Sequence, residues 1–245
     1  MTEPAPPRPA FYAARPGGWR DWWTLLHPPY TAWHLSYVVL GACLAPAPDL
    51  ERLAGTLLAF FLAVGIAAHA LDERHGRPLG TAISDRALVA ATALSLAGAV
   101  ALGVVGVVRV GPSLVAFIVL GPLLVVAYNA ELFGGLVHTD PGFAAAWGAF
   151  PVLTAYVAQA QRLSGVAVLA ALGAFALSLA QRSLSTPVRR LRRAVRDVRG
   201  VETSADGTET GFGRAQLLAP MERALKLLSW AVVLTAGAVA WARLG

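Results

Sequence analysis

The sequence predicts an all-α fold, a polytopic bundle of transmembrane helices. Of the 245 residues, 56% are hydrophobic and 14% are charged, whereas about a quarter of the residues in a soluble domain are charged. The mean hydropathy is +0.59. Several uninterrupted apolar runs approach the roughly 20 residues with which a helix crosses a hydrocarbon layer. These runs lack the alternation of outer-membrane strands, so helices must satisfy the backbone hydrogen bonds.

The apolar runs predict about seven spans. Pro28 and Pro29 precede the first span and separate it from an interfacial segment. Stretches rich in glycine, proline or charge end the other spans. The predicted spans cover residues 31–46, 52–71, 87–107, 112–130, 142–160, 164–182 and 224–243.

The N-terminal residues 1–24 precede the membrane domain, which we place at residues 25–245. They are rich in proline and contain no continuous apolar core, so they predict a disordered tail and not a secretory signal. The sequence WRDWW at residues 19–23 is typical of an aromatic anchor at headgroup depth.

The charge distribution predicts the orientation. We place the protein in the plasma (inner) membrane with its N-terminus in the cytoplasm. Sixteen of the 20 Lys and Arg residues then fall in cytoplasmic segments. The formal net charge of +6 therefore reflects topology and anionic lipid, and it does not indicate a nucleic-acid partner.

One long polar interruption, residues 183–220, separates the last two spans. Its first half predicts a basic helix with an apolar face, and its second half predicts a flexible loop. Two interpretations of the helix remain open. It lies on the membrane surface against anionic lipids, or its arginines, Arg189 and Arg190 among them, cover a diphosphate.

The stretch AAHALDERHGRPLGTAISDR at residues 67–86 carries the densest charge between two apolar runs. Helical spacing places His69, Asp72 and His75 on one face and pairs Glu73 with Arg77. A solvated helix end would explain these residues. Alternatively, Asp72 and Glu73 offer oxygen ligands suited to Mg²⁺ at the mouth of the bundle.

The order of these features resembles the UbiA superfamily of intramembrane prenyltransferases. HPPYTAWHLSYVVLGACLAP is similar to its first helix, and ALDERHGRPLGTAIS resembles a shortened form of its first aspartate motif. YNAELFGGLVHTDPGFAAAWGAFPVLTAYVA is similar to the end of its fourth helix and its fifth. The resemblance covers about residues 25–200 and implies a UbiA-like fold.

The resemblance also implies a chemistry, in which Mg²⁺ holds a prenyl diphosphate and an acceptor attacks its allylic carbon. Asp72 then matches the second aspartate of the first motif, and Arg77 matches its basic turn. We expect Asp72 and Glu73 to be catalytic and to bind the metal. The expected substrate-binding residues are Arg77, His69, Tyr128, Asn129, Arg189 and Arg190.

The sequence departs from the family pattern at defined positions. Ala68 and His69 stand where the family has asparagine and aspartate, and Gln181 and Arg182 occupy the place of its second acidic motif. Three hypotheses therefore remain: a prenyltransferase acting on an unknown acceptor, a non-catalytic relative that binds lipid or a partner, and a metal site formed by His69, Asp72 and His75.

Overall fold

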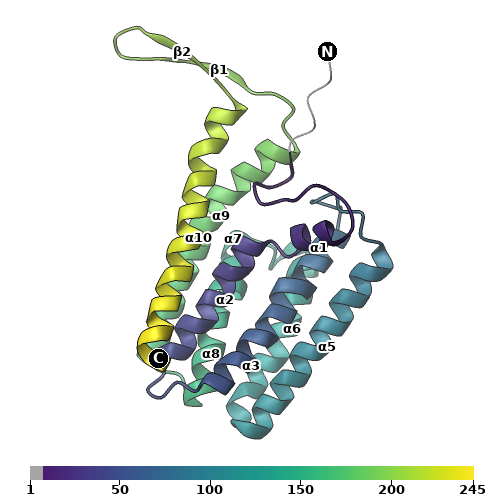
Figure 1. Cartoon of the computed structure of the whole chain (residues 1–245), viewed down its shortest axis with the longest axis vertical. Coiled ribbons are helices and arrows are strands. Elements are labelled where there is room, and N and C mark those ends of the chain that lie inside the picture. The colour runs from purple at the N-terminus through teal and green to yellow at the C-terminus, as the bar shows by residue number, and fades with distance from the viewer. Residues whose placement is uncertain (1–7) are drawn as a thin grey trace.

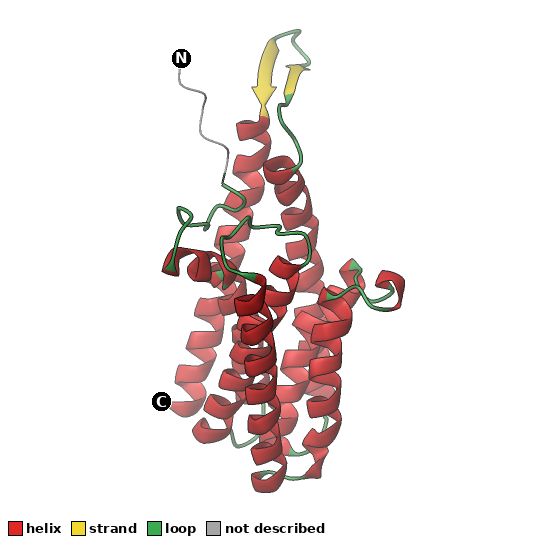
Figure 2. Cartoon of the chain, turned by 90° about the vertical axis from the view of Figure 1, so that its right-hand side faces the viewer, coloured by secondary structure: helices red, strands yellow, loops and turns green. Residues whose placement is uncertain are grey.

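The computed structural model describes residues 8–245, and they form a helical bundle with one protruding β-hairpin (Figures 1 and 2). The part of the predicted tail at residues 1–7 lies outside the described residues. In chain order the elements are α1 Trp19–Leu25, α2 Pro28–Cys43, α3 Leu50–Phe60, η1 Phe61–Ala68, α4 His69–Arg74, α5 Asp85–Arg109, η2 Pro112–Leu114, α6 Val115–Asn129, η3 Phe133–Gly135, α7 Asp140–Phe143, η4 Ala144–Ala149, α8 Phe150–Ala160, α9 Gly165–Arg193, β1 Arg199–Thr203, β2 Glu209–Gly213 and α10 Arg214–Leu244.

Six helical stretches in this part of the chain are long and apolar enough to cross a membrane, which confirms the helical class and indicates an integral membrane protein. They are Leu50–Arg74, Asp85–Arg109, Pro112–Asn129, Asp140–Ala160, Gly165–Arg193 and Arg214–Leu244. The first predicted span corresponds to α2, which has 16 residues and is shorter than the other six.

Side-chain caps begin several of these helices where the sequence changes from polar to apolar. The carboxylate of Asp49 accepts the backbone N–H of Arg52 at 2.8 Å before α3. The hydroxyl of Thr139 accepts that of Gly142 at 3.1 Å before α7. Ser84 and Ser164 cap α5 and α9 in the same way. Each cap satisfies a helix N–H that would otherwise lack a partner.

The interior of the bundle depends on close helix contacts. Trp33 and Tyr37 of α2 are buried against Val152 of α8 and Ala174 of α9. At Gly41 the backbone of α2 approaches α8 so closely that an added Cβ would overlap the carbonyl oxygen of Val152. Small residues allow this approach, which is typical of packed transmembrane helices.

Two spans contain π-helical segments, η1 and η4. η1 contains no proline, whereas η4 is followed by Pro151, which lacks the N–H that would bond the carbonyl of Trp147. Single π-turns inside α-helices occur frequently at functional sites. Val64 of η1 and Trp147 of η4 are both buried, and both line two cavities of the bundle.

The structure corrects the prediction for residues 183–220. The basic stretch is not a separate surface helix, because α9 continues through Pro187 to Arg193. Val188 and Leu191 of its apolar face pack on Leu218 and Leu225 of α10, so protein covers the face that the surface-helix interpretation places against lipid.

The predicted flexible loop is also different. Residues 199–203 and 209–213 pair as the antiparallel strands β1 and β2, which project beyond the helices in Figure 2. Gly207, with φ +85°, turns the chain between them. The last helix begins at Arg214, well before the predicted span at 224.

The N-terminal segment also differs from the predicted disorder. Ala10 and Ala13 are 7% and 2% exposed, and the chain runs from them into α1. In α1, Asp21 accepts the N–H groups of Gly17 at 3.0 Å and Ala82 at 3.2 Å, which ties the segment to the loop before α5. Trp19, Trp22 and Trp23 remain exposed, as an interfacial anchor requires.

Candidate functional site

A polar cavity, here called the basic pocket, lies at the end of the bundle that carries the hairpin and the N-terminal segment. Its volume is about 500 Å³, within the range of small-molecule sites. Its walls come from the N-terminal segment, α2, η1, α4, α6, η4 and α9. Its polar lining residues are Tyr12, His27, Tyr30, His34, His69, Asp72, Asn129, Tyr128, His138, Gln181, Arg182, Ser185, Arg189, Arg190 and Arg193.

The structure brings together most of the residues that the sequence singled out. His69, Asp72, Tyr128, Asn129, Arg189 and Arg190 all line the basic pocket. They come from three helices that are distant in the sequence, α4, α6 and α9. Glu73 and Arg77 do not line it.

Glu73 has a structural role in place of the predicted metal-binding one. Its side chain is fully buried. One carboxylate oxygen accepts the backbone N–H of Leu79 at 2.9 Å, and the other accepts the N–H and the hydroxyl of Thr81, both at 2.8 Å. The carboxylate therefore orders the glycine-rich loop after α4, and its lone pairs are used there.

Arg77 also differs from its predicted role. It has φ +53° because the chain turns sharply after Gly76, and its guanidinium donates to the carbonyl of Ile83 and forms an ion pair with Asp85. The predicted pairing of Glu73 with Arg77 is therefore wrong. The Arg-Pro turn folds back on the start of α5, so Pro78 lines the basic pocket and the Arg77 side chain does not.

The carboxylates present do not fit a metal ion held by two acids of this motif. Asp72 lines the pocket while its neighbour Glu73 points into the loop. Within residues 8–245 no three His, Cys, Asp or Glu side chains are grouped so that they could hold a metal ion. This also removes the geometric support for a site formed by His69, Asp72 and His75.

Positive charge dominates the pocket instead. Arg182, Arg189, Arg190 and Arg193 face a single lining carboxylate, Asp72. Arg182 pairs with Asp140 at 2.7 Å, whereas the other three form no ion pair with any described residue. Guanidinium groups without carboxylate partners are well suited to bind phosphate oxygens.

The histidines of the pocket are held in defined orientations by backbone carbonyls. The Nδ1 atoms of His34, His69 and His138 donate to the carbonyl oxygens of Trp147, Gly65 and Tyr128 at 2.9, 3.1 and 2.9 Å. His138 lies before α7, lines the pocket and stacks on Tyr128 with ring centroids 4.4 Å apart.

His27 is the exception among these rings. Its Nδ1 is hydrogen-bonded to the hydroxyl of Tyr12, and its Nε2 is buried without a partner among the described residues. Burial is the main cause that lowers the pKa of His27 well below its usual value, and the nearby His69, Arg193 and Arg189 lower it further. A neutral ring carries one proton, so it either accepts the Tyr12 hydroxyl at Nδ1 and presents Nε2–H to the pocket, or donates from Nδ1 and presents a bare Nε2.

The N-terminal segment covers the pocket, which the sequence did not predict. Arg192 and Arg193 of α9 donate to the carbonyls of Arg8 and Pro9 at 3.1 and 3.3 Å. The ammonium of Lys226 in α10 lies 5.0 Å from the ring of Phe11. The aromatic pair Phe11–Tyr12 inside a proline-rich tail was the one signal for this docking.

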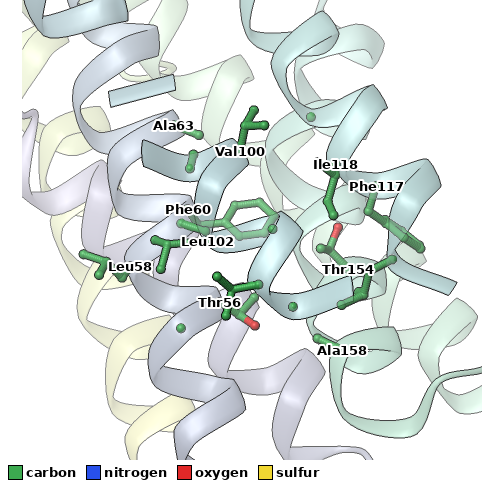
Figure 3. A pocket seen from close by; sticks show the side chains of 18 of the residues that line it. Thr56, Leu58, Phe60, Ala63, Val100, Leu102, Phe117, Ile118, Thr154 and Ala158 are labelled. Carbon is green, nitrogen blue, oxygen red and sulfur yellow. The ribbon is translucent and has the colours of Figure 1, made fainter. Parts of the chain in front are cut away.

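A second cavity, here called the apolar cavity, lies between the helices and shares wall residues with the basic pocket. Its volume is about 770 Å³, and its walls come from α3, η1, α5, α6, η4 and α8. Figure 3 shows apolar side chains such as Phe60, Val100 and Ile118 around it. Val64 and Trp147 line both cavities, so a polar, cationic chamber and an apolar one meet at these two residues.

Comparisons of the chain with protein-family models, with curated proteins and with solved structures give no match.

Proposed function

We propose that this chain is a UbiA-like membrane protein that binds a prenyl diphosphate, with the diphosphate in the basic pocket and the isoprenoid tail in the apolar cavity. The observation that carries the proposal is the wall shared at Val64 and Trp147 between an arginine-rich pocket and an apolar cavity. Few ligands other than an amphiphile with an anionic head match both chambers.

Prenyl transfer to an acceptor is the activity that this arrangement supports. The C–O bond to the diphosphate breaks as the acceptor forms a bond to the allylic carbon, and the arginines stabilise the charge of the departing diphosphate. The carboxylate of Asp72 is the group in the pocket that accepts the acceptor's proton. The apolar cavity shields the allylic cation from water.

The alternative is a non-catalytic relative that binds the same lipid. One specific observation favours it: the second acid of the motif, Glu73, is bound to the loop and is not available for chemistry. Incubation of purified protein with an allylic diphosphate and a cell extract that supplies acceptors separates the two, because only the enzyme releases diphosphate.

We further propose a topology in which α2 is the first of seven spans and the pocket end faces the cytoplasm of a plasma (inner) membrane. The support is that sixteen of the 20 Lys and Arg residues fall in segments assigned to that side. Reporter fusions after Gly200 and after Gly245 should then give opposite signals, and identical signals would contradict the topology.

Binding is tested by calorimetric titration of the purified protein in detergent with three probes: farnesyl diphosphate, farnesol and inorganic pyrophosphate. We expect farnesyl diphosphate to bind at least tenfold more tightly than either half of the molecule, because each half fills only one chamber. Equal affinity for pyrophosphate would identify a free-phosphate site, and equal affinity for farnesol would identify a site for neutral lipid. Either result would overturn the proposal.

A further inference from the structure

We infer that the basic pocket binds its phosphate head directly through side-chain donors, without a divalent cation bridging the phosphate to Asp72. This rests on the proposed function and defines how the head is recognised. The inference starts from the charges that line the pocket, four arginines and one carboxylate. Arg182 is paired with Asp140, and the three arginines without a carboxylate partner still outnumber Asp72, so the pocket itself supplies net positive charge to a phosphate head.

The arginines are available for this role. Arg189 is half-buried, and its guanidinium makes one hydrogen bond to a described residue, to the Thr186 hydroxyl at 3.3 Å. Arg190 is exposed and lies next to it on α9, one helical turn before Arg193. Side chains one turn apart lie on the same helix face, so Arg189 and Arg193 can contact one phosphate together.

Neutral groups add two further points of contact. The Nε2 atom of His27 is buried in a ring that lines the pocket, and it has no partner among residues 8–245. In the tautomer that accepts the Tyr12 hydroxyl at Nδ1, this atom carries a proton that an anion can accept. Gln181, whose side chain is 3% exposed, has an amide oxygen position without a partner in the same part of the chain. Because amide oxygen and nitrogen are assigned from their partners, Gln181 can present its NH₂ group to an anion. An unpartnered buried donor is costly, and a phosphate oxygen satisfies it.

A bridging cation lacks comparable support. Mg²⁺ requires several oxygen ligands in near-octahedral geometry, and the pocket provides one carboxylate, because Glu73 is fully buried and accepts three hydrogen bonds from Leu79 and Thr81. A cation placed at Asp72 would also be repelled by Arg189 and Arg193.

The two modes of recognition give opposite expectations for Asp72→Asn. If a cation bridges the head to Asp72, this change removes a charged ligand and abolishes binding. If the arginines bind the head directly, the change removes a negative charge that repels the phosphate, and affinity stays the same or rises about threefold.

The experiment titrates farnesyl diphosphate into the full-length protein in detergent, once with EDTA and once with excess Mg²⁺. We expect dissociation constants that agree within about twofold in the two buffers, unchanged or tighter binding to Asp72→Asn, and binding at least about tenfold weaker to Arg189→Gln. Arg190→Gln, at an exposed side chain, tests the same point in a variant whose folding is not at risk. Arg196→Gln, outside the pocket on the segment after α9, is the matched charge control and should bind like the wild type.

The outcomes separate the inference from the proposed function. Binding that requires Mg²⁺ and is lost in Asp72→Asn overturns the inference and leaves the proposed function in place. Wild-type affinity in both Arg189→Gln and Arg190→Gln also overturns the inference. Absence of binding in both buffers overturns the proposed function itself.

Discussion

The substitution Glu73→Gln separates a structural carboxylate from a metal-binding one. In the structure one carboxylate oxygen accepts the N–H of Leu79, and the other accepts the N–H and the hydroxyl of Thr81. A glutamine of the same shape keeps the oxygen that faces Thr81 but directs its NH₂ group at the N–H of Leu79. That buried donor loses its acceptor, which costs about 1–3 kcal/mol.

For a chain of this length, 1 kcal/mol corresponds to a shift of about 2–4 °C in Tm. We therefore expect Glu73→Gln to lower the Tm by about 4–8 °C for a 2 kcal/mol loss. The assay is thermal unfolding of the purified protein in detergent, followed by tryptophan fluorescence. Glu131→Gln, at an exposed side chain, is the control and should leave the Tm unchanged.

Affinity for farnesyl diphosphate, measured below the Tm of the variant, should be unaffected by Glu73→Gln, because the side chain does not line the basic pocket. A variant with the wild-type Tm and no affinity for the ligand would refute this reasoning and restore a direct role for Glu73.

Two further predictions concern packing and pH. Gly41→Ala should destabilise the protein by about 1–3 kcal/mol, because the new methyl group overlaps the carbonyl of Val152 and separates α2 from α8. Gly173→Ala, where the space is open, should be neutral or stabilising; equal Tm values for both variants would contradict the close approach. The second prediction rests on the lowered pKa of His27. Its unfolded-state pKa is about 6.5, so the stability that the buried neutral ring contributes above that pH should be lost as the pH falls below it. Protonation of the folded protein would place a charge in the buried site and make Nδ1 a donor to the Tyr12 oxygen. Protection factors in the N-terminal segment, which are hydrogen-exchange rates corrected for the intrinsic pH dependence, should then fall at acid pH, and less so in His27→Gln. Protection factors independent of pH between about 7 and 5 would show that His27 is not buried neutral.

The helical class and the helix positions could be predicted from the sequence because they depend on local composition. Apolar runs and capping residues such as Asp49 and Ser84 are readable one segment at a time. The two errors in the 183–220 stretch have a different origin. Whether the apolar face of Val188 and Leu191 meets lipid or α10 depends on tertiary packing, which periodicity does not contain.

The candidate site could be predicted in part for the same reason. The sequence identified His69, Asp72 and Arg189 as residues of unusual chemistry near an apolar boundary, and the fold collects them in one pocket. Adjacent positions on a helix point in different directions. Asp72 therefore lines the pocket, while Glu73 binds the loop after α4. The docking of Tyr12 on His27 joins residues 15 positions apart without any regular spacing, so no periodic signal could reveal it.

The central claim is that one ligand occupies both chambers, its head among the arginines and its tail in the apolar cavity. The most direct measurement is photo-crosslinking with a farnesyl diphosphate analogue that carries a diazirine at the tail end, followed by mass spectrometry of the labelled peptides. The account predicts labels on walls of the apolar cavity such as Phe60 and Ile118, with labelling competed by unmodified farnesyl diphosphate and lost in Arg189→Gln. Labels confined to the exposed faces of α9 and α10, for example at Leu169 and Trp230, and insensitive to competitor, would contradict it.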